Sequence, residues 1–367
     1  MTDSTQNILY HLWLQRVKGA KLLKHFNSPQ DIYNADIEKF AYHNIPPASV
    51  KLLMDKSLDS ENNIIADCAK FDIKIMCIND NFYPNLLKQL TNPPLLLYYI
   101  GDVQNLTKLP NSIAVIGSRT PSIYAEQQTK RFATFLANSG FTIVSGMARG
   151  IDTIAHSSAL SVNGNTIAVV GNGLDTSYPA ENKALMKLIA HNGIVLSEYP
   201  PHTAPVSNHF PTRNRIISAL SQAVLVMECT IKSGSMTSVD HARKQNKPIF
   251  TIPSNLDNIR ATGNFELLKT NGIIATAPED ICKHLNISPN FMSTTVGTSG
   301  AHGASHTSTN ATQKTILSHL NSSVPTNLDT LAMRTNLPIP TINAQLAILE
   351  LTHQVKRLNS KSYIKIV

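Results

Sequence analysis

The 367-residue sequence has few of the patterns that mark metal sites or disulfide frameworks. Its four cysteines, Cys68, Cys77, Cys229 and Cys282, lie far apart without a CxxC pair, which is typical of reduced thiols in a cytoplasmic protein. Its 13 histidines show no HExxH or similar ligand spacing. We therefore expect no metal site.

Signals for membranes and for common nucleotide cofactors are missing as well. The sequence shows no signal peptide and no apolar run of membrane-spanning length, so we expect a cytoplasmic protein without membrane contact. It has no G-x-x-x-x-G-K-[ST] motif, which disfavours ATP hydrolysis of the P-loop type. It also lacks G-x-G-x-x-G, which disfavours a nicotinamide dehydrogenase, and no cofactor is expected.

Positive charge is in modest excess and is unevenly distributed. The chain carries 32 Lys and Arg against 24 Asp and Glu, a net charge of +8. Residues 1–75 hold 9 basic and 9 acidic residues, 76–313 hold 17 and 13, and 314–367 hold 6 and 2. The excess in the middle and the tail favours an acidic partner such as nucleic acid.

Residues 1–75 are predicted to form a small helical domain. Apolar residues between Leu9 and Val17 lie at helical spacing, and further helices are expected over 31–40 and 49–58. The pattern resembles a helix-hairpin-helix or sterile-alpha-motif (SAM) domain. Its zero net charge favours a packing role, and phosphate contact by backbone amides at a hairpin is the alternative.

Residues 76–287 are predicted to form a Rossmann-like α/β domain. Short apolar runs begin 24 to 29 residues apart, about the length of a strand, a crossover helix and two loops. Several of these runs are apolar throughout, which indicates parallel strands buried on both faces. The expected strands are Ile113–Ile116, Thr142–Val144, Thr166–Val170, Ile194–Leu196, Ala223–Met227, Ile249–Ile252 and Ile273–Ala275.

Two further segments follow the expected parallel sheet. Residues 288–313 are rich in Ser, Thr, Gly, Ala and His and carry no Asp, Glu, Lys or Arg, which indicates a flexible linker. Residues 314–367 predict a winged-helix domain, because three helical segments precede a hairpin. Glu350 is the one charged residue of the third expected helix, so contact with protein is at least as well supported as contact with DNA. The expected elements are helices over 314–320, 328–334 and 341–351 and strands over 355–358 and 363–367.

Anion-binding turns are predicted where several strands end. Ligands of a parallel sheet bind beyond the carboxyl ends of its strands. Small residues that open a helix suit phosphate there, because free backbone amides and the positive end of the helix dipole face it. The turns that fit are 117–122, 145–152, 171–173 and 232–237. Four such turns at one sheet edge predict phosphate binding.

One segment adds two arginines beside an aromatic ring. Arg213 and Arg215 follow Phe210 closely in the sequence. Arginine grips phosphate in a fork, and a ring can stack on a base, as in single-stranded nucleic-acid sites. The alternative for each arginine is a structural ion pair with Glu198 or Glu228.

Acidic residues and a histidine near these turns do not form a catalytic pattern. The candidates are Asp152, His156, Glu198 and Glu228. No spacing pairs a nucleophile with a base. Asp152 and His156 lie four residues apart, which more often marks a helix-start carboxylate and its neighbour. No catalytic residue is therefore assigned.

Taken in order, these motifs resemble those of the bacterial DNA-processing protein DprA (Smf) family. The motifs that carry the resemblance are Ile113–Arg119, Val144–Asp152, Thr166–Asp175, Phe210–Ile217 and Glu228–Thr237. The resemblance covers roughly residues 80–285 closely, and the flanking domains agree in kind. Departures include Pro253-Ser254, where the family usually has Pro-Gly.

The resemblance implies a single-stranded DNA-binding protein of natural transformation without enzymatic activity. Such proteins protect incoming DNA, load the recombinase RecA onto it and form homodimers through the Rossmann-like domain. Transferred motif by motif, the DNA-binding residues would be Gly117, Ser118, Arg119, Ser145, Gly146, Phe210, Arg213, Asn214, Arg215, Ser233, Gly234, Ser235 and Thr237. The first five would meet phosphate and Phe210 would contact bases, whereas the others would shape the pocket and its rim.

Two other functions are weighed against this one. A nucleoside-monophosphate phosphoribohydrolase resembling the "lonely guy" proteins would share the Rossmann-like sheet, but its Pro-Gly-Gly-x-Gly-Thr motif is absent after Met227. A regulator of double-stranded DNA would depend on the winged helix, whose third helix lacks positive charge. Release of a free base from AMP would identify the first.

Overall fold

The structure, a computed structural model, describes residues 3–17, 19–43, 45–288, 311–322, 324–351, 354–358 and 362–366. The chain divides into two compact units, each of which is considered by itself. One comprises residues 1–120 and 129–291, and the other comprises residues 292–367 with the short segment 121–128. Most of the predicted linker, residues 289–310, and the turn at 359–361 lie outside the described residues.

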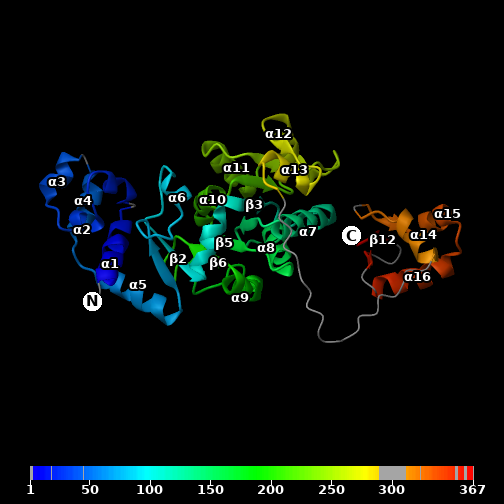
Figure 1. The fold of residues 1–367 in the computed structure, drawn as a ribbon, viewed down its shortest axis with the longest axis horizontal. Helices are drawn as coiled ribbons and strands as arrows, with labels where there is room; N and C mark the ends of the chain where they lie inside the picture. The colour runs from blue at the N-terminus through cyan, green and yellow to red at the C-terminus, as the bar shows by residue number, and fades with distance from the viewer. Residues whose placement is uncertain are drawn as a thin grey trace. The chain divides into compact units, whose positions relative to one another are not determined.

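A nine-stranded sheet in the order β1-β2-β6-β5-β4-β3-β7-β8-β9 forms the centre of the first unit (Figure 1). The seven strands from β6 to β9 in this order are parallel, whereas β1 and β2 add an antiparallel edge. The strands are β1 (Lys74–Cys77), β2 (Leu96–Gly101), β3 (Ser112–Ile116), β4 (Thr142–Ser145), β5 (Thr166–Val170), β6 (Ile194–Ser197), β7 (Ala223–Val226), β8 (Ile249–Thr251) and β9 (Ile273–Ile274). Strand order reverses at β3, and open α/β sheets bind ligands at such a point.

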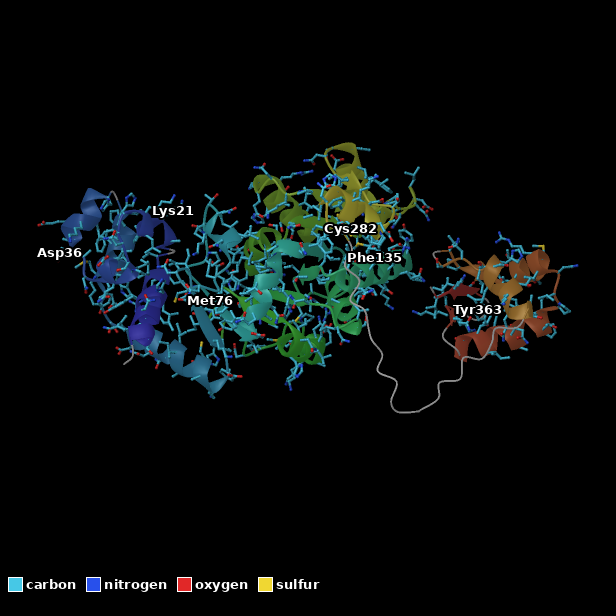
Figure 2. The ribbon with its side chains drawn as sticks, viewed as in Figure 1. Lys21, Asp36, Met76, Phe135, Cys282 and Tyr363 are labelled. Carbon is cyan, nitrogen blue, oxygen red and sulfur yellow. The ribbon has the colours of Figure 1, made fainter. Side chains whose placement is uncertain are left out.

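All seven predicted strands are confirmed, each within one residue of its expected ends. Every residue of β3 to β8 is buried, as expected for strands covered on both faces. The sequence did not predict β1 and β2, which precede the regular strand–helix repeat. Met76 of β1 nevertheless packs into the same core as the central strands (Figure 2).

Six helices connect the parallel strands, namely α7 (Ile123–Asn138), α8 (Ile151–Ser161), α9 (Lys183–Asn192), α10 (His209–Ala219), α11 (Gly234–Lys244) and α12 (Thr262–Lys269). Helix α6 (Asn85–Lys88) lies between β1 and β2, and α13 (Pro278–His284) follows β9. Helices α8 and α9 pack on each other, and so do α10 and α11. Because crossovers are right-handed, the reversal at β3 places these two pairs on opposite faces of the sheet.

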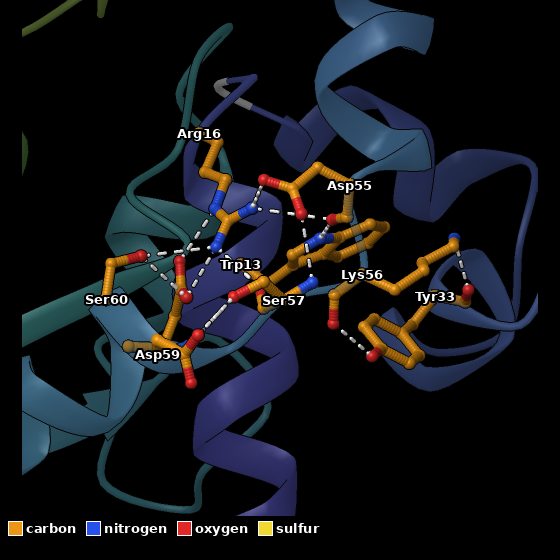
Figure 3. Close-up of polar contacts among 9 residues, drawn as sticks. Trp13, Arg16, Tyr33, Asp55, Lys56, Ser57, Asp59 and Ser60 are labelled. Atoms are coloured by element: carbon orange, nitrogen blue, oxygen red, sulfur yellow. Dashed lines mark hydrogen bonds and ion pairs between the residues drawn. The ribbon is translucent and has the colours of Figure 1, made fainter.

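The N-terminal helices form their own apolar cluster, which includes Trp13 and Phe40. They are α1 (Asp3–Gln15), α2 (Pro29–Tyr33), α3 (Ile37–Tyr42), α4 (Pro47–Met54) and α5 (Asp59–Lys70). The helix expected over 31–40 is wrong, because α2 ends at Tyr33 and α3 begins at Ile37. The helix expected over 49–58 also ends early, at Met54. Asp55 is extended there, and its carbonyl accepts the Trp13 indole N–H at 2.8 Å (Figure 3).

The second unit is a winged helix, as the sequence predicted. Its helices are α14 (Ala311–His319), α15 (Leu328–Thr335) and α16 (Ile339–Leu351), and its strands are β10 (Thr326–Asn327), β11 (Val355–Arg357) and β12 (Ser362–Lys365). The strands form a small sheet in the order β10-β12-β11. Leu331, Leu346 and Tyr363 are buried in its core, and Tyr363 is labelled in Figure 2.

Candidate nucleic-acid interface

A cleft of about 630 Å³ opens where β3 and β7 end, at the reversal of strand order. Its size is within the range of ligand-binding pockets. We term it the strand-end cleft. Nine of the 13 predicted DNA-binding residues line it, namely Gly117, Ser118, Arg119, Phe210, Arg213, Asn214, Ser233, Gly234 and Ser235. Ser145, Gly146, Arg215 and Thr237 do not.

The turn after β3 presents an exposed arginine on a rigid backbone. A Cβ on Gly117 would lie 2.7 Å from the Ile151 side chain, so this position requires glycine. The Ser118 N–H donates to the Glu228 carbonyl at 2.7 Å, which fixes the turn against the end of β7. Arg119 is exposed at the cleft and makes no ion pair with any residue that the structure describes. Its charge is therefore available to an anion.

Phe210, in the first turn of α10, lies in a small group of flat side chains. Its ring stacks on Tyr178 with centroids 5.5 Å apart, and the Arg119 guanidinium lies 5.6 Å from its centroid. The recess beside these residues measures only about 30 Å³, whereas Phe210 also lines the much larger strand-end cleft. A base would therefore reach the Phe210 ring from the strand-end cleft.

The turn after β4 uses its hydrogen-bond donors inside the protein. Ser145 is buried, and its hydroxyl donates to the Val115 carbonyl at 2.7 Å. The Gly146 and Ala148 N–H groups both donate to Asp152 Oδ2 at 3.2 Å. Burial raises the pKa of Asp152, and the charge of Arg213 opposes that shift. The Ser145 hydroxyl and the Gly146 N–H thus both donate to groups inside the protein. The phosphate contact predicted for these two residues stays a prediction.

Arg213 is a buried cation, 5% exposed, in the wall of the cleft. Its Nη1 donates to the carbonyls of Gly146 (2.7 Å) and Val169. A Cβ on Gly146 would lie 2.6 Å from the guanidinium, so glycine here makes room for the arginine. Burial lowers the pKa of Arg213 to about 10, while the negative charge of Asp152 raises it.

Arg215 lies outside the strand-end cleft and forms an ion pair. Its Nη2 donates to both carboxylate oxygens of Glu198 at 2.5 Å. The two side chains are only 12% and 19% exposed. This is one of the structural pairs that the sequence left open, whereas Glu228 instead accepts a hydrogen bond from Asn258 at 3.1 Å.

The first turn of α11 forms the opposite rim of the cleft. Ser233 is the N-cap residue, but its side chain makes no capping hydrogen bond, and the first turn carries no acidic residue. The Ser235 hydroxyl donates to the Gly117 carbonyl at 2.8 Å. Asn214 donates to the Thr237 hydroxyl at 2.7 Å, which joins α10 to α11. An uncapped helix N-terminus beside Arg119 suits a phosphate group, because its amides and dipole favour negative charge.

Tyr178 and Arg260 also line the cleft, although neither is among the predicted DNA-binding residues. Tyr178 belongs to a Tyr-Pro pair beyond β5, and no sequence pattern places it at the cleft. Its position there is evident from its stacking on Phe210. Arg260 lies in a short turn whose backbone is held by Asn258. This turn follows β8, so the rule that ligand residues follow strand ends would have found it.

Three of the candidate acid–base residues have partners within the protein: Glu198 pairs with Arg215, Glu228 accepts from Asn258, and His156 contacts Thr166. His156 is buried, and its Nδ1 is 2.7 Å from the Thr166 hydroxyl. Burial lowers its pKa to about 3, with a further contribution from the Arg213 charge, so the ring is neutral near pH 7. The thiol of Cys229 in the cleft wall is also inert, because burial raises its pKa to about 12.

Metal binding and membrane insertion find no support in the described part of the chain. No group of three or more His, Cys, Asp or Glu side chains in those residues could hold a metal ion. No helix among them is long and apolar enough to cross a bilayer.

The fold and the cleft define the chain as an α/β protein whose Rossmann-like sheet carries an open, positively charged cleft at its strand ends. A winged-helix domain follows this α/β domain in the chain.

The chain belongs to the DNA recombination-mediator protein A family, whose model matches residues 74–286, and the DprA winged helix domain model matches residues 301–360. It is 36% identical over 274 residues to Protein Smf of Escherichia coli, covering 74% of this chain and 72% of that protein. It is 39% identical over 204 residues to DNA processing protein DprA of Streptococcus pneumoniae, covering 56% of this chain and 71% of that protein.

Two solved structures resemble this one at the level of fold and sequence. DprA from Streptococcus pneumoniae matches with a TM-score of 0.59 and 33% identity, covering 64% of this chain and 81% of that one. DNA processing protein A from Helicobacter pylori, described for its single-stranded DNA binding mode, matches with a TM-score of 0.54 and 36% identity, covering 59% and 96%. The resemblance stated from sequence motifs is therefore confirmed at the level of family and fold.

Proposed function

We propose that this chain binds single-stranded DNA in the strand-end cleft. The observation that carries the proposal is the exposed Arg119, which lies beside the Phe210 ring and on the same cleft as the uncapped start of α11. An arginine and a helix N-terminus suit phosphate, and aromatic rings suit bases. The similar protein from Helicobacter pylori is described as binding single-stranded DNA, which supports the proposal.

Within this proposal, the cleft residues divide into contacts and supports. Gly117, Ser118 and Arg119 meet a phosphate, and Phe210 stacks on a base. Arg213 and Asn214 shape the wall, and Ser233, Gly234, Ser235 and Thr237 form the rim, all as transferred from the family motifs. Ser145, Gly146 and Arg215 also belong to the transferred set, and their present partners suit supporting roles.

The proposed biological role is that of a non-enzymatic mediator of natural transformation in the cytoplasm. The protein protects incoming single-stranded DNA and loads the RecA recombinase onto it, and it forms a homodimer through the Rossmann-like domain. Family membership supports this role, because relatives are named as DNA-processing proteins.

A fluorescence anisotropy titration tests the proposal. Labelled oligo-dT and a duplex of equal length are titrated with the protein at several salt concentrations. We expect preference for oligo-dT and weaker binding at higher salt, because phosphate contacts release counterions. Equal affinity for the two DNAs would contradict the proposal. Clear release of free base from AMP would instead support the phosphoribohydrolase alternative.

A further inference from the structure

A second pocket of about 550 Å³ lies between α10, the end of α11 and the segment that follows α6. It uses Arg215 and Ala219 of α10, which lie one turn apart and away from the face that lines the strand-end cleft. We term it the basic pocket. Its principal polar residues are Arg215, His241, Lys244, Gln245, Asn246 and Lys247.

The charge of the basic pocket favours an anion. None of its lining residues is acidic, although Arg215 is paired with Glu198 nearby. Lys244 is exposed and forms no ion pair with the residues that are described. Lys247 donates to the Ser221 carbonyl at 2.7 Å, which leaves two of its three ammonium donors for a ligand. Burial lowers the pKa of His241, so this ring adds no charge near pH 7.

Two buried polar atoms at the basic pocket have no hydrogen-bond partner in the described structure. They are Arg215 Nη1 and Gln245 Oε1. The Gln245 amide nitrogen donates to the Arg215 carbonyl at 3.2 Å, and Arg215 Nη2 is held by Glu198. Arg215 Nη1 is an unused buried donor, whereas Gln245 Oε1 is an acceptor, which offers no hydrogen bond to a phosphate oxygen. Because the ammonium groups of Lys244 and Lys247 bind phosphate well, phosphate is the ligand chemistry that fits.

The basic pocket and the strand-end cleft are neighbours. Pro211 lines the cleft, and its carbonyl is 3.2 Å from His241 Nε2 in the basic pocket. Helix α11 connects the two sites, with Ser235 at the cleft and Lys244 at the pocket. Nine residues of helix span about 14 Å at ~1.5 Å per residue. A stacked strand covers that distance in about four nucleotides at ~3.4 Å each.

We propose that the basic pocket is a second phosphate site, which holds the backbone of the same single strand about four nucleotides from the strand-end cleft. The inference rests on the proposed function, since it assigns a path to the DNA that enters the cleft. It extends the DNA contact surface to Lys244 and Lys247, which no motif singled out. The path runs over Pro211 and His241.

Oligo-dT length separates this second site from the first. The chain and its Lys244→Gln and Lys244→Gln/Lys247→Gln variants are titrated with labelled oligo-dT of about 4 and about 16 nucleotides, the range of reported site sizes. For the long oligonucleotide we expect the log–log salt slope to fall by about 0.7 for one lysine and about 1.4 for two. The short one should bind all three proteins equally, because it cannot span both sites.

Lys187→Gln is the matched control, because Lys187 is an exposed lysine on α9 outside both sites. The single Lys244→Gln variant guards against misfolding, since Lys244 is exposed and Lys247 is partly buried. Unchanged binding of the long oligonucleotide by both variants would overturn the second site while leaving the first intact. An equal loss for both lengths would also overturn it. Failure of the unaltered chain to bind either oligonucleotide would overturn the proposed function itself.

Discussion

Arginines in the N-terminal helices and at the strand-end cleft are used in opposite ways. Arg16 donates to Glu61 Oε1 and Oε2 at 2.8 and 2.6 Å, to Asp55 Oδ2 at 3.2 Å and to the Ser57 carbonyl at 2.7 Å (Figure 3). Arg119 forms no ion pair among the described residues, and its guanidinium lies 5.6 Å from the centroid of the Phe210 ring. A charge that is neutralised internally stabilises the fold, whereas an unpaired charge at a strand end is available to a ligand.

The same difference between paired and unpaired arginines is found near the strand-end cleft itself. Arg213 and Arg215 belong to the same segment as Phe210, yet both are bound to protein groups in the manner of Arg16. Proximity in sequence therefore does not make an arginine a ligand contact. Whether an arginine can contact a ligand depends on its hydrogen-bond partners and on its exposure.

The largest expected effect follows the loss of Arg213. The Arg213→Ala variant leaves the Gly146 and Val169 carbonyls without their donor and Asp152 without its nearby cation. We expect the free energy of unfolding to fall by about 3–5 kcal/mol, as when one partner of a buried charge pair is removed. Urea denaturation measures the change. Arg119→Ala is the control and should stay within about 0.5 kcal/mol, so equal losses would erase the distinction.

The Arg16→Ala variant tests the same rule in the helical region. Glu61 is 2% exposed and would lose its charged partner. We expect the free energy of unfolding to fall by about 2–3 kcal/mol, because hydrogen bonds to charged groups contribute about that much to stability. Affinity for oligo-dT, measured where the variant is folded, should not change. A loss of DNA affinity would show that Arg16 does more than hold the helices.

Phe210→Ala examines the exposed side of the comparison. We expect binding of oligo-dT to weaken by about 1–3 kcal/mol, the contribution of one stacked base. Phe82→Ala is a matched control, because Phe82 is 40% exposed and does not line the strand-end cleft. Anisotropy titrations of both variants measure the difference. If the two lose affinity alike, the Phe210 ring has no specific role.

His156 lies in the buried layer beneath the cleft and should make stability depend on pH. Its pKa is lowered to about 3 in the folded chain, from about 6.5 when unfolded. The unfolded state therefore binds more protons between these values, and stability is lost as the pH falls from about 6.5 toward 3. The His156→Gln variant should remove up to about 1.4 kcal/mol per pH unit of that dependence. Urea denaturation at several pH values checks it, and identical slopes for the two proteins would contradict a neutral buried histidine.

Strand positions could be predicted from sequence because burial on both faces leaves a continuous apolar run. Ala223–Met227 is such a run, and β7 lies there. The antiparallel strand β2 was missed because nothing in Leu96–Gly101 shows that its partner is β6, about 100 residues later. Helix α4 ends at Met54, and the Asp55 carbonyl beyond it accepts a hydrogen bond from Trp13, 42 residues earlier, which no local pattern reveals.

The candidate site could be predicted in outline and not in its hydrogen bonds. Gly117, Arg119 and Phe210 were found because strand-end position and residue type determine exposure and chemistry. The roles of Ser145 and Gly146 were harder, because Asp152 and Val115 use their donors in three dimensions. Arg260 comes to the cleft through the turn after β8.

The smallest predicted change tests the central claim most directly. The salt dependence of oligo-dT affinity is measured by anisotropy for the unaltered chain, for Arg119→Ala and for Lys187→Gln. The account predicts that Arg119→Ala flattens the log–log salt slope by about 0.7, because one phosphate contact is lost, and that Lys187→Gln leaves it unchanged. Oligo-dT binding with the same slope in all three proteins would contradict the claim that the unpaired charge of the strand-end cleft holds the DNA.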